Sequence, residues 1–166
     1  AARQVIAAGA LLLSLSSAIA QTAISTLAGS SPAIASGNLE GSGTAARFNA
    51  LASVAVDSAG NIYVADAGNN KIRKVTPEGV VTTLAGSGAA GNANGNGAAA
   101  TFSAPSGVAT DNTFVYVADT GNHAIRKIQI ANPQAVTTLA GSTASPAVFG
   151  TTNDTGALAR FWNPSG

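Results

Sequence analysis

Short apolar runs alternate with clusters of turn-forming residues along most of this chain. Residues 62–65 read Ile-Tyr-Val-Ala, and residues 66–70 then read Asp-Ala-Gly-Asn-Asn. Tyr and Val favour extended backbone, whereas Asp, Gly and Asn favour tight turns. Residues 71–75 resume the apolar pattern, with Lys and Arg between the apolar positions. This pattern predicts a β-hairpin over residues 61–75, and its recurrence predicts a second one over residues 114–128.

The hairpin belongs to a longer repeating unit. The sequence Leu-Ala-Gly-Ser begins at Leu27, Leu84 and Leu139, which gives a period of 55 to 57 residues. Four antiparallel strands at such a period indicate a blade of a β-propeller. The strands of the first unit are predicted at residues 54–56, 62–65, 71–76 and 80–85. We therefore expect an all-β chain of four-stranded antiparallel blades, with about two complete blades and partial ones.

The residues of the two hairpins resemble the NHL repeat. The first copy contains Asn61-Ile62-Tyr63-Val64-Ala65-Asp66, Gly68-Asn69-Asn70 and Ile72-Arg73-Lys74, and the second contains Val115-Tyr116-Val117-Ala118-Asp119, Gly121-Asn122-His123 and Ile125-Arg126-Lys127. The resemblance covers nearly everything after about residue 24. It implies a β-propeller, usually of about six blades, and it implies no single activity. Because six such blades would need roughly 330 residues, we expect a fragment of a longer protein.

The repeat divides the chain into six predicted segments. They are a signal peptide at 1–20, a closing outer strand and loop at 21–47, an NHL blade at 48–86, an inter-blade loop at 87–101, a second NHL blade at 102–141, and a loop with the start of a truncated third blade at 142–166. The closing strand is expected because residues 24–29 match residues 81–86 of a fourth strand. Its partner strands are expected from a segment beyond residue 166.

Residues 1–20 have the pattern of a secretory signal. Arg3 supplies a positive charge, residues 5–15 are mostly apolar, and residues 18–20 read Ala-Ile-Ala, which fits a cleavage site. A membrane anchor is the alternative, but the apolar stretch is shorter than the ~20 residues of a membrane span. We therefore expect a secreted, periplasmic or extracellular protein with no stable membrane insertion after cleavage.

Composition narrows the classes of partner and cofactor. Charged residues make up 9% of the chain and the net charge is +1, which is far from the basic balance of a nucleic-acid-binding protein. The chain has no Cys and one His, so thiolate or histidine-rich metal sites cannot form from this segment alone. No cofactor is predicted, although calcium stays open.

Two Asp and two Arg residues occupy the same positions in both hairpins. Asp66 precedes Arg73 by seven residues, as Asp119 precedes Arg126. They could form an acid–base or ligand-binding set. Because a structural residue is needed in every blade and a catalytic one only once, we interpret them as turn and ion-pair residues that brace neighbouring blades.

Oxygen-bearing side chains give weak calcium candidates. Asp57 and Asp111 end the first strand of each blade, where carboxylates could line the mouth of a central channel. Glu40, Asn94 and Asn153 share one position in the connecting loops. The alternative for the two Asp residues is turn capping.

Two other residues are candidates for a binding surface. Trp162 follows Phe161, which matches Phe48 and Phe102 at predicted core positions, but Trp162 itself matches polar residues. His123 stands where the first copy has Asn70. We interpret His123 mainly as a surface turn residue.

These observations favour an exported propeller that serves as a binding or scaffold module. Its expected partner is a protein or a glycan on the loop face, with no nucleic acid. The alternative is a propeller enzyme, of lactonase-like hydrolase or amidating-lyase-like type, with a metal in the central channel. Enzyme activity therefore stays uncertain, with the binding module favoured, because fold alone does not fix function.

Overall fold

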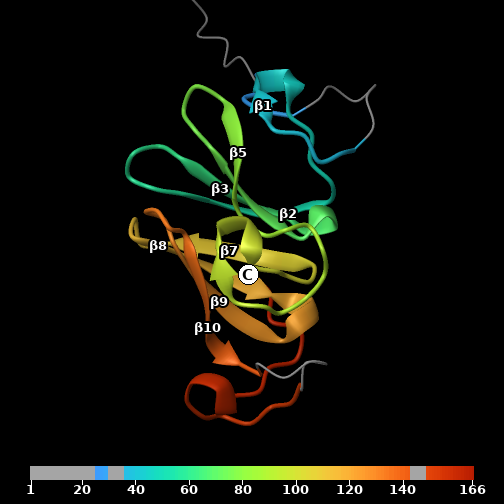
Figure 1. Cartoon of the computed structure of the whole chain (residues 1–166), viewed down its shortest axis with the longest axis vertical. Coiled ribbons are helices and arrows are strands. Elements are labelled where there is room, and N and C mark those ends of the chain that lie inside the picture. Colours follow the sequence, from blue (N-terminus) through green and yellow to red (C-terminus); the bar gives the residue numbers. More distant parts are fainter. Residues whose placement is uncertain (1–24, 30–35, 143–148) are drawn as a thin grey trace, which may run out of the picture.

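The computed structural model describes residues 25–29, 36–142 and 149–166, and it shows two five-stranded antiparallel sheets (Figure 1). The first sheet has the order β1 (Gly41–Ser42), β5 (Val80–Ala85), β4 (Lys71–Val75), β3 (Ile62–Asp66) and β2 (Leu51–Val56). The second has the order β6 (Gly95–Asn96), β10 (Ala135–Gly141), β9 (Ala124–Gln129), β8 (Phe114–Asp119) and β7 (Pro105–Thr110). The sheets are two blades of a β-propeller fold, as the repeat predicts.

Each blade contains the four predicted strands and a fifth strand that the sequence pattern does not predict. The fifth strand is two residues long and comes from the segment that leads into the blade. β1 pairs with β5 and β6 pairs with β10, both antiparallel. The predicted loop at 87–101 therefore contributes an edge strand to the second blade, and short edge strands limit unwanted pairing.

Among the described residues, four short 3-10 helices lie between strands and a fifth follows β10. They are η1 (Gly43–Ala45), η2 (Ala67–Asn69), η3 (Gly97–Ala99), η4 (Thr120–Asn122) and η5 (Gly156–Leu158). η2 and η4 form the hairpin turns and are capped by the residues that follow them, Asn70 and His123, which have φ values of 50° and 52°. Asn adopts this left-handed conformation readily, and His is also enriched there.

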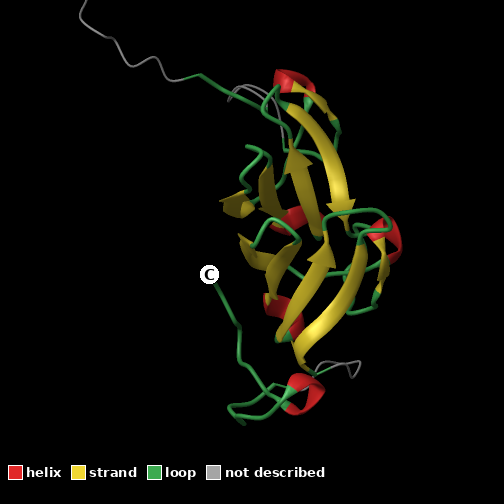
Figure 2. Cartoon of the chain, turned by 90° about the vertical axis from the view of Figure 1, so that its left-hand side faces the viewer, coloured by secondary structure: helices red, strands yellow, loops and turns green. Residues whose placement is uncertain are grey.

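The main apolar core lies between the two blades, which pack side by side (Figure 2). Tyr63 and Ile72 of the first blade belong to the same buried cluster as Phe102, Val115 and Ile128. Alternate residues of the first blade face the other way, where Val64 and Val75 form a second cluster with Phe48 at its edge. Because residues on both faces of β3 are buried, that strand reads as a continuous apolar run.

Residues 25–29 contain no strand, but they contact the first blade as the residue after β5 contacts the second. The Gly29 N–H donates to the Gly43 carbonyl at 3.1 Å, and the Gly86 N–H donates to the Gly97 carbonyl at the same distance. Both glycines also lie against the ring of the following phenylalanine, Phe48 or Phe102. The matching contacts of Gly29 and Gly86 favour the interpretation of residues 25–29 as the outer strand of another blade, and this interpretation stays a prediction.

Within the described residues, no helix is long and apolar enough to cross a membrane. The predicted signal at 1–20 lies outside the described residues.

Candidate functional site

The Asp and Arg residues that recur in both hairpins form buried ion pairs. Arg73 donates from Nη1 to Asp66 Oδ2 at 3.0 Å, and Arg126 donates likewise to Asp119 at 2.8 Å. All four side chains are almost completely buried. Each guanidinium also lies over a phenylalanine ring, at 5.4 Å from the Phe48 centroid in the first blade.

These pairs tie each blade to the segment that leads into it. Arg126 donates to the Ala93 carbonyl at 3.0 Å and to Asn94 Oδ1 at 2.9 Å, and Arg73 donates to the Leu39 carbonyl at 3.0 Å. The expectation that the pairs brace one blade against the next needs correction, because both partners belong to one hairpin. Burial raises the pKa of Asp119 despite the hydrogen bonds from Ser103, Asn122 and Arg126.

Asp57 and Asp111 cap turns. Asp57 accepts hydrogen bonds from the Ala59 and Asn61 N–H groups and from the Tyr63 hydroxyl. Burial acts to raise the pKa of Asp57, but these hydrogen bonds lower it overall. The pKa of Asp111 is lowered by hydrogen bonds from the Phe114 and Thr113 N–H groups and the Tyr116 hydroxyl. The carboxylate oxygens of both residues therefore accept hydrogen bonds from their own turn and from the strand that follows it.

The loop candidates also have protein partners. Glu40 accepts from the Thr83 N–H at 2.8 Å, and hydrogen bonding with Thr83 lowers the pKa of Glu40. Asn94 accepts from Arg126, while Asn153 lines a cavity near the C-terminus. Among the described residues, no three His, Asp or Glu side chains gather as a metal site would require. Calcium binding and metal-dependent enzyme activity stay predictions, and no cluster of metal-ligating side chains among the described residues supports them.

His123 and Trp162 belong to one aromatic cluster, which Phe149 completes. The ring centroids of His123 and Phe149 are 5.2 Å apart, and those of Phe149 and Trp162 are 5.0 Å apart, with tilted planes. Such tilted contacts are favourable arrangements of aromatic rings. The Asn163 N–H donates to His123 Nδ1 at 3.1 Å, which holds the chain end beside the turn.

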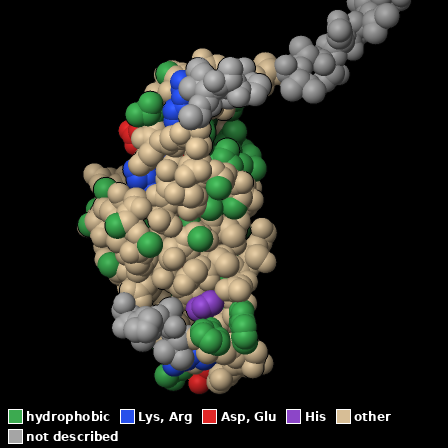
Figure 3. All heavy atoms as spheres, turned by 90° about the vertical axis from the view of Figure 1, so that its right-hand side faces the viewer, with side chains coloured by type: hydrophobic (Ala, Val, Ile, Leu, Met, Phe, Trp, Pro, Cys, Tyr) green, Lys and Arg blue, Asp and Glu red, His purple; other side chains and the backbone are tan. Residues whose placement is uncertain are grey.

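The cluster is open to solvent. Phe149 is 54% exposed and Trp162 is 65% exposed. Figure 3 shows the histidine at the surface, with hydrophobic side chains close by. Sequence analysis singled out His123 and Trp162 but missed Phe149. The available signal was a large aromatic residue before Gly150, where the earlier copies have Ser36 and Ala90.

The equivalent junction between the first two blades has the same backbone contacts without the aromatic rings. There Asn70 replaces His123, Ala90 replaces Phe149 and Ser103 replaces Trp162. Asn70 Oδ1 accepts from the Ala104 N–H at 2.9 Å, as His123 accepts from Asn163. Since the backbone arrangement forms without aromatic residues, the cluster is not needed to build the junction.

Comparison with known proteins supports the repeat family. The model of the NHL repeat matches residues 48–75 and 102–128. Over 89 residues the chain is 39% identical to chicken (Gallus gallus) NHL repeat-containing protein 2, a match that covers 53% of this chain and 12% of that protein. The chain thus spans about an eighth of the length of this curated relative.

Two solved structures from Bacteroides have a similar fold. A protein of unknown function from Bacteroides thetaiotaomicron is 26% identical, with a TM-score of 0.56, over 64% of this chain and 26% of its own. An auxiliary nutrient binding protein from Bacteroides ovatus gives a TM-score of 0.58 at 18% identity, over 74% of this chain and 33% of its own, which shows the fold alone. The two segments that match the family model, one in each blade, therefore identify NHL repeats in this chain.

Proposed function

We propose that this chain is a binding module whose contact surface is the cluster of His123, Phe149 and Trp162. The observation that carries the proposal is the difference between two otherwise equivalent junctions. One carries Asn70, Ala90 and Ser103, whereas the other carries three aromatic rings with two of them more than half exposed. Exposed aromatic side chains leave apolar surface in contact with water, and covering that surface with a partner is favourable.

A protein partner fits this surface best. Trp is enriched among the residues that dominate protein–protein binding energy, and aromatic residues generally are enriched in interfaces. The tilted packing of Phe149 between the other two rings limits their rotation, so less side-chain entropy is lost when a partner binds. Apart from the imidazole of His123, the cluster consists of the apolar rings of Phe149 and Trp162, so the contact is mainly aromatic in character.

Selection of peptides from a displayed random library against the full chain tests this proposal. Bound peptides are then titrated by calorimetry against the chain and its variants. We expect Trp162→Ala and Phe149→Ala to weaken binding at least about tenfold, as for interface residues that dominate affinity. Leu158→Ala is the matched control, because Leu158 is 61% exposed on η5 but is not one of the three rings.

The same titrations separate the outcomes. Peptides that bind all variants equally contradict a role for the cluster. Absence of peptide binding, together with Trp162-dependent binding on a glycan array, replaces the protein partner with a glycan. No binding to either library contradicts the binding module.

We also propose that the protein is exported, on the signal pattern of residues 1–20. Fusion of residues 1–30 to a leaderless alkaline phosphatase should give periplasmic activity and cleavage after Ala20. A fusion that stays inactive in the cytoplasm contradicts export.

A further inference from the structure

His123 is the titratable member of the aromatic cluster, and its hydrogen bond depends on its protonation state. Nδ1 of His123 accepts from the Asn163 N–H at 3.1 Å. A ring nitrogen accepts only while it carries no proton, so this bond requires the neutral imidazole with its proton on Nε2. Imidazole groups gain a second proton between about pH 8 and 5, and in this ring that proton occupies Nδ1. The contact between the hairpin turn and residue 163 is therefore sensitive to pH.

The bond supports a backbone conformation that is uncommon for residues other than glycine. Asn163 has a φ of 46°, and Ala104, at the equivalent place in the first junction, has a φ of 45°. Both lie in the left-handed region. In each junction a side chain of the preceding hairpin turn accepts from the N–H of that residue, Asn70 from Ala104 and His123 from Asn163. The imidazole therefore stabilises the bend that carries Trp162.

The first junction makes the same contact with a group that does not titrate. Asn70 Oδ1 accepts from the Ala104 N–H at 2.9 Å, and an amide oxygen keeps its acceptor character throughout this pH range. Ala90, which occupies the position of Phe149, is exposed although a complete blade follows it. This place on the surface is therefore open between two full blades, and the junction with the aromatic cluster is the one whose contact responds to protons.

On the hairpin that carries His123, the charged side chains are engaged elsewhere. Asp119 and Arg126 form the buried ion pair at 2.8 Å, and Lys127 Nζ lies 4.1 Å from the Phe114 centroid. β10, which pairs with β9 directly after this turn, contains no charged residue. The hairpin and its neighbouring strand thus leave the charge of the ring to its own protonation.

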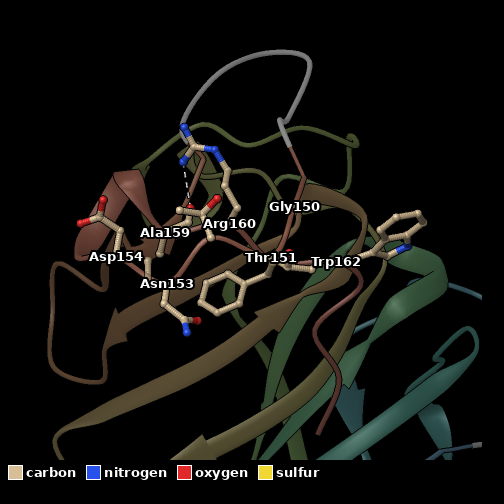
Figure 4. A pocket seen from close by; sticks show the side chains of 10 residues that line it. Gly150, Thr151, Asn153, Asp154, Ala159, Arg160 and Trp162 are labelled. Atoms are coloured by element: carbon tan, nitrogen blue, oxygen red, sulfur yellow. Dashed lines mark hydrogen bonds between the residues drawn. The ribbon is translucent and has the colours of Figure 1, made fainter.

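The segment on the other side of the ring, residues 149–163, carries two charged side chains, Asp154 and Arg160. Asp154 accepts from the Thr155 N–H at 2.7 Å, and Arg160 donates to two backbone carbonyls of its own segment. Figure 4 shows the side chain of Trp162 pointing away from both. The charge change at the cluster therefore comes from His123 itself.

We propose that protonation of His123 releases residues 162 and 163 from the hairpin turn and thereby weakens partner binding by the aromatic cluster. The imidazole stays beside Phe149, because a cation within about 6 Å of a ring centroid is attracted to it, and the two centroids are 5.2 Å apart. The contact that is lost is the one to Asn163. A Trp162 with a freer backbone loses more conformational entropy when a partner binds. The control of binding rests on the function proposed above, whereas the release does not.

Amide exchange measured by NMR on the full chain tests the release. His123 is the only histidine, so its ring resonances report its protonation directly. We expect protection of the Asn163 amide, corrected for the intrinsic pH dependence of exchange, to fall about threefold to tenfold between about pH 8 and 5, as loss of one hydrogen bond predicts. The fall should share its midpoint with the titration of His123. The Ala104 amide, which Asn70 holds in the same molecule, should keep its protection.

His123→Asn is the matched variant, because it installs the residue of the first junction at a position with nearly the same φ, 52° against 50°. In this variant the Asn163 amide should stay protected across the whole pH range. The release is overturned if Asn163 protection does not follow the His123 titration, if the Ala104 amide loses protection to the same extent, or if the variant keeps the pH dependence.

Calorimetry tests the control of binding separately, with peptides selected against the cluster at about pH 7.5 that lack Asp, Glu and His. We expect their affinity for the original chain to fall at least about threefold at about pH 5.5, and their affinity for His123→Asn to be the same at both pH values. A pH-independent affinity beside a pH-dependent Asn163 amide overturns the control of binding. Absence of any bound peptide contradicts the binding function and with it this control, while the exchange data still establish or refute the release.

Discussion

Replacement of Arg126 by Met should destabilise the fold by about 3–5 kcal/mol, because removal of one member of a buried ion pair leaves the other charge without compensation. Arg126 and Asp119 are both fully buried and their charged atoms are 2.8 Å apart. At an effective dielectric constant of about 20, the Coulomb attraction over that distance is roughly 6 kcal/mol. Desolvation costs several kcal/mol per ion, so the intact pair makes only a small net contribution to the free energy of folding.

The destabilisation by Arg126→Met therefore comes from the buried polar groups that lose their partner. Asp119 keeps hydrogen bonds from Ser103 and Asn122 but loses its counter-charge. The Thr101 carbonyl also loses a donor. Met preserves much of the packing against Phe102, so the loss reports on polar groups rather than on a cavity.

Equilibrium urea unfolding of the full chain measures this free energy. Lys127→Met is the control, since Lys127 is half-buried on the same strand and its cation–π contact with Phe114 is worth about 0.5–1 kcal/mol. In the double variant, Asp119→Asn removes the stranded charge and keeps an acceptor for Ser103. It should recover at least about 1 kcal/mol relative to the sum of the single changes. Similar costs for Arg126→Met and Lys127→Met, or strict additivity in the double variant, would refute the reasoning.

Three further predictions concern turns and core. The pKa of Asp111 is lowered in the folded chain, so its contribution to stability should be present above the ordinary pKa of about 3.9 and lost as the pH falls below it. Asp111→Asn should therefore reduce the loss of unfolding free energy that denaturant titrations measure between pH 5 and 2. Gly86→Ala should cost about 1–3 kcal/mol in thermal unfolding, because φ is 107° and the added Cβ would lie 2.6 Å from the Asn70 carbonyl oxygen. Phe102→Ala should cost about 3–5 kcal/mol in the same assay, whereas Phe149→Ala, at an exposed position, should cost far less.

The regular strands were predictable because their apolar residues repeat with the turns between them. β3, β4 and β5 lie within a residue or so of the predicted ranges, since each joins buried side chains to clear turn residues. The Asp66–Arg73 contact was also foreseeable as a pair, because both residues recur at one spacing. Its attachment to the leading segment was not, because the acceptor at Leu39 is a backbone carbonyl that carries no sequence signal.

Two other features depend on tertiary proximity. β1 and β6 consist of Gly, Ser and Asn, so no apolar periodicity distinguishes them from loop; only pairing with an outer strand makes them strands. The contact of His123 with Phe149 joins residues far apart in the sequence. Neither residue alone indicates that a third ring, Trp162, lies beside them.

The short edge strands β1 and β6 also define the smallest interchangeable cassette in this architecture. Because each blade takes its outermost strand from the segment before it, a cut at Phe48 or Phe102 would separate a blade from its own edge. A cut after Gly86 and Gly141 keeps β6, η3 and β7 to β10 together. Recombination or grafting of single modules between related propellers should therefore follow the Leu-Ala-Gly boundaries, so that each module keeps its own edge strand.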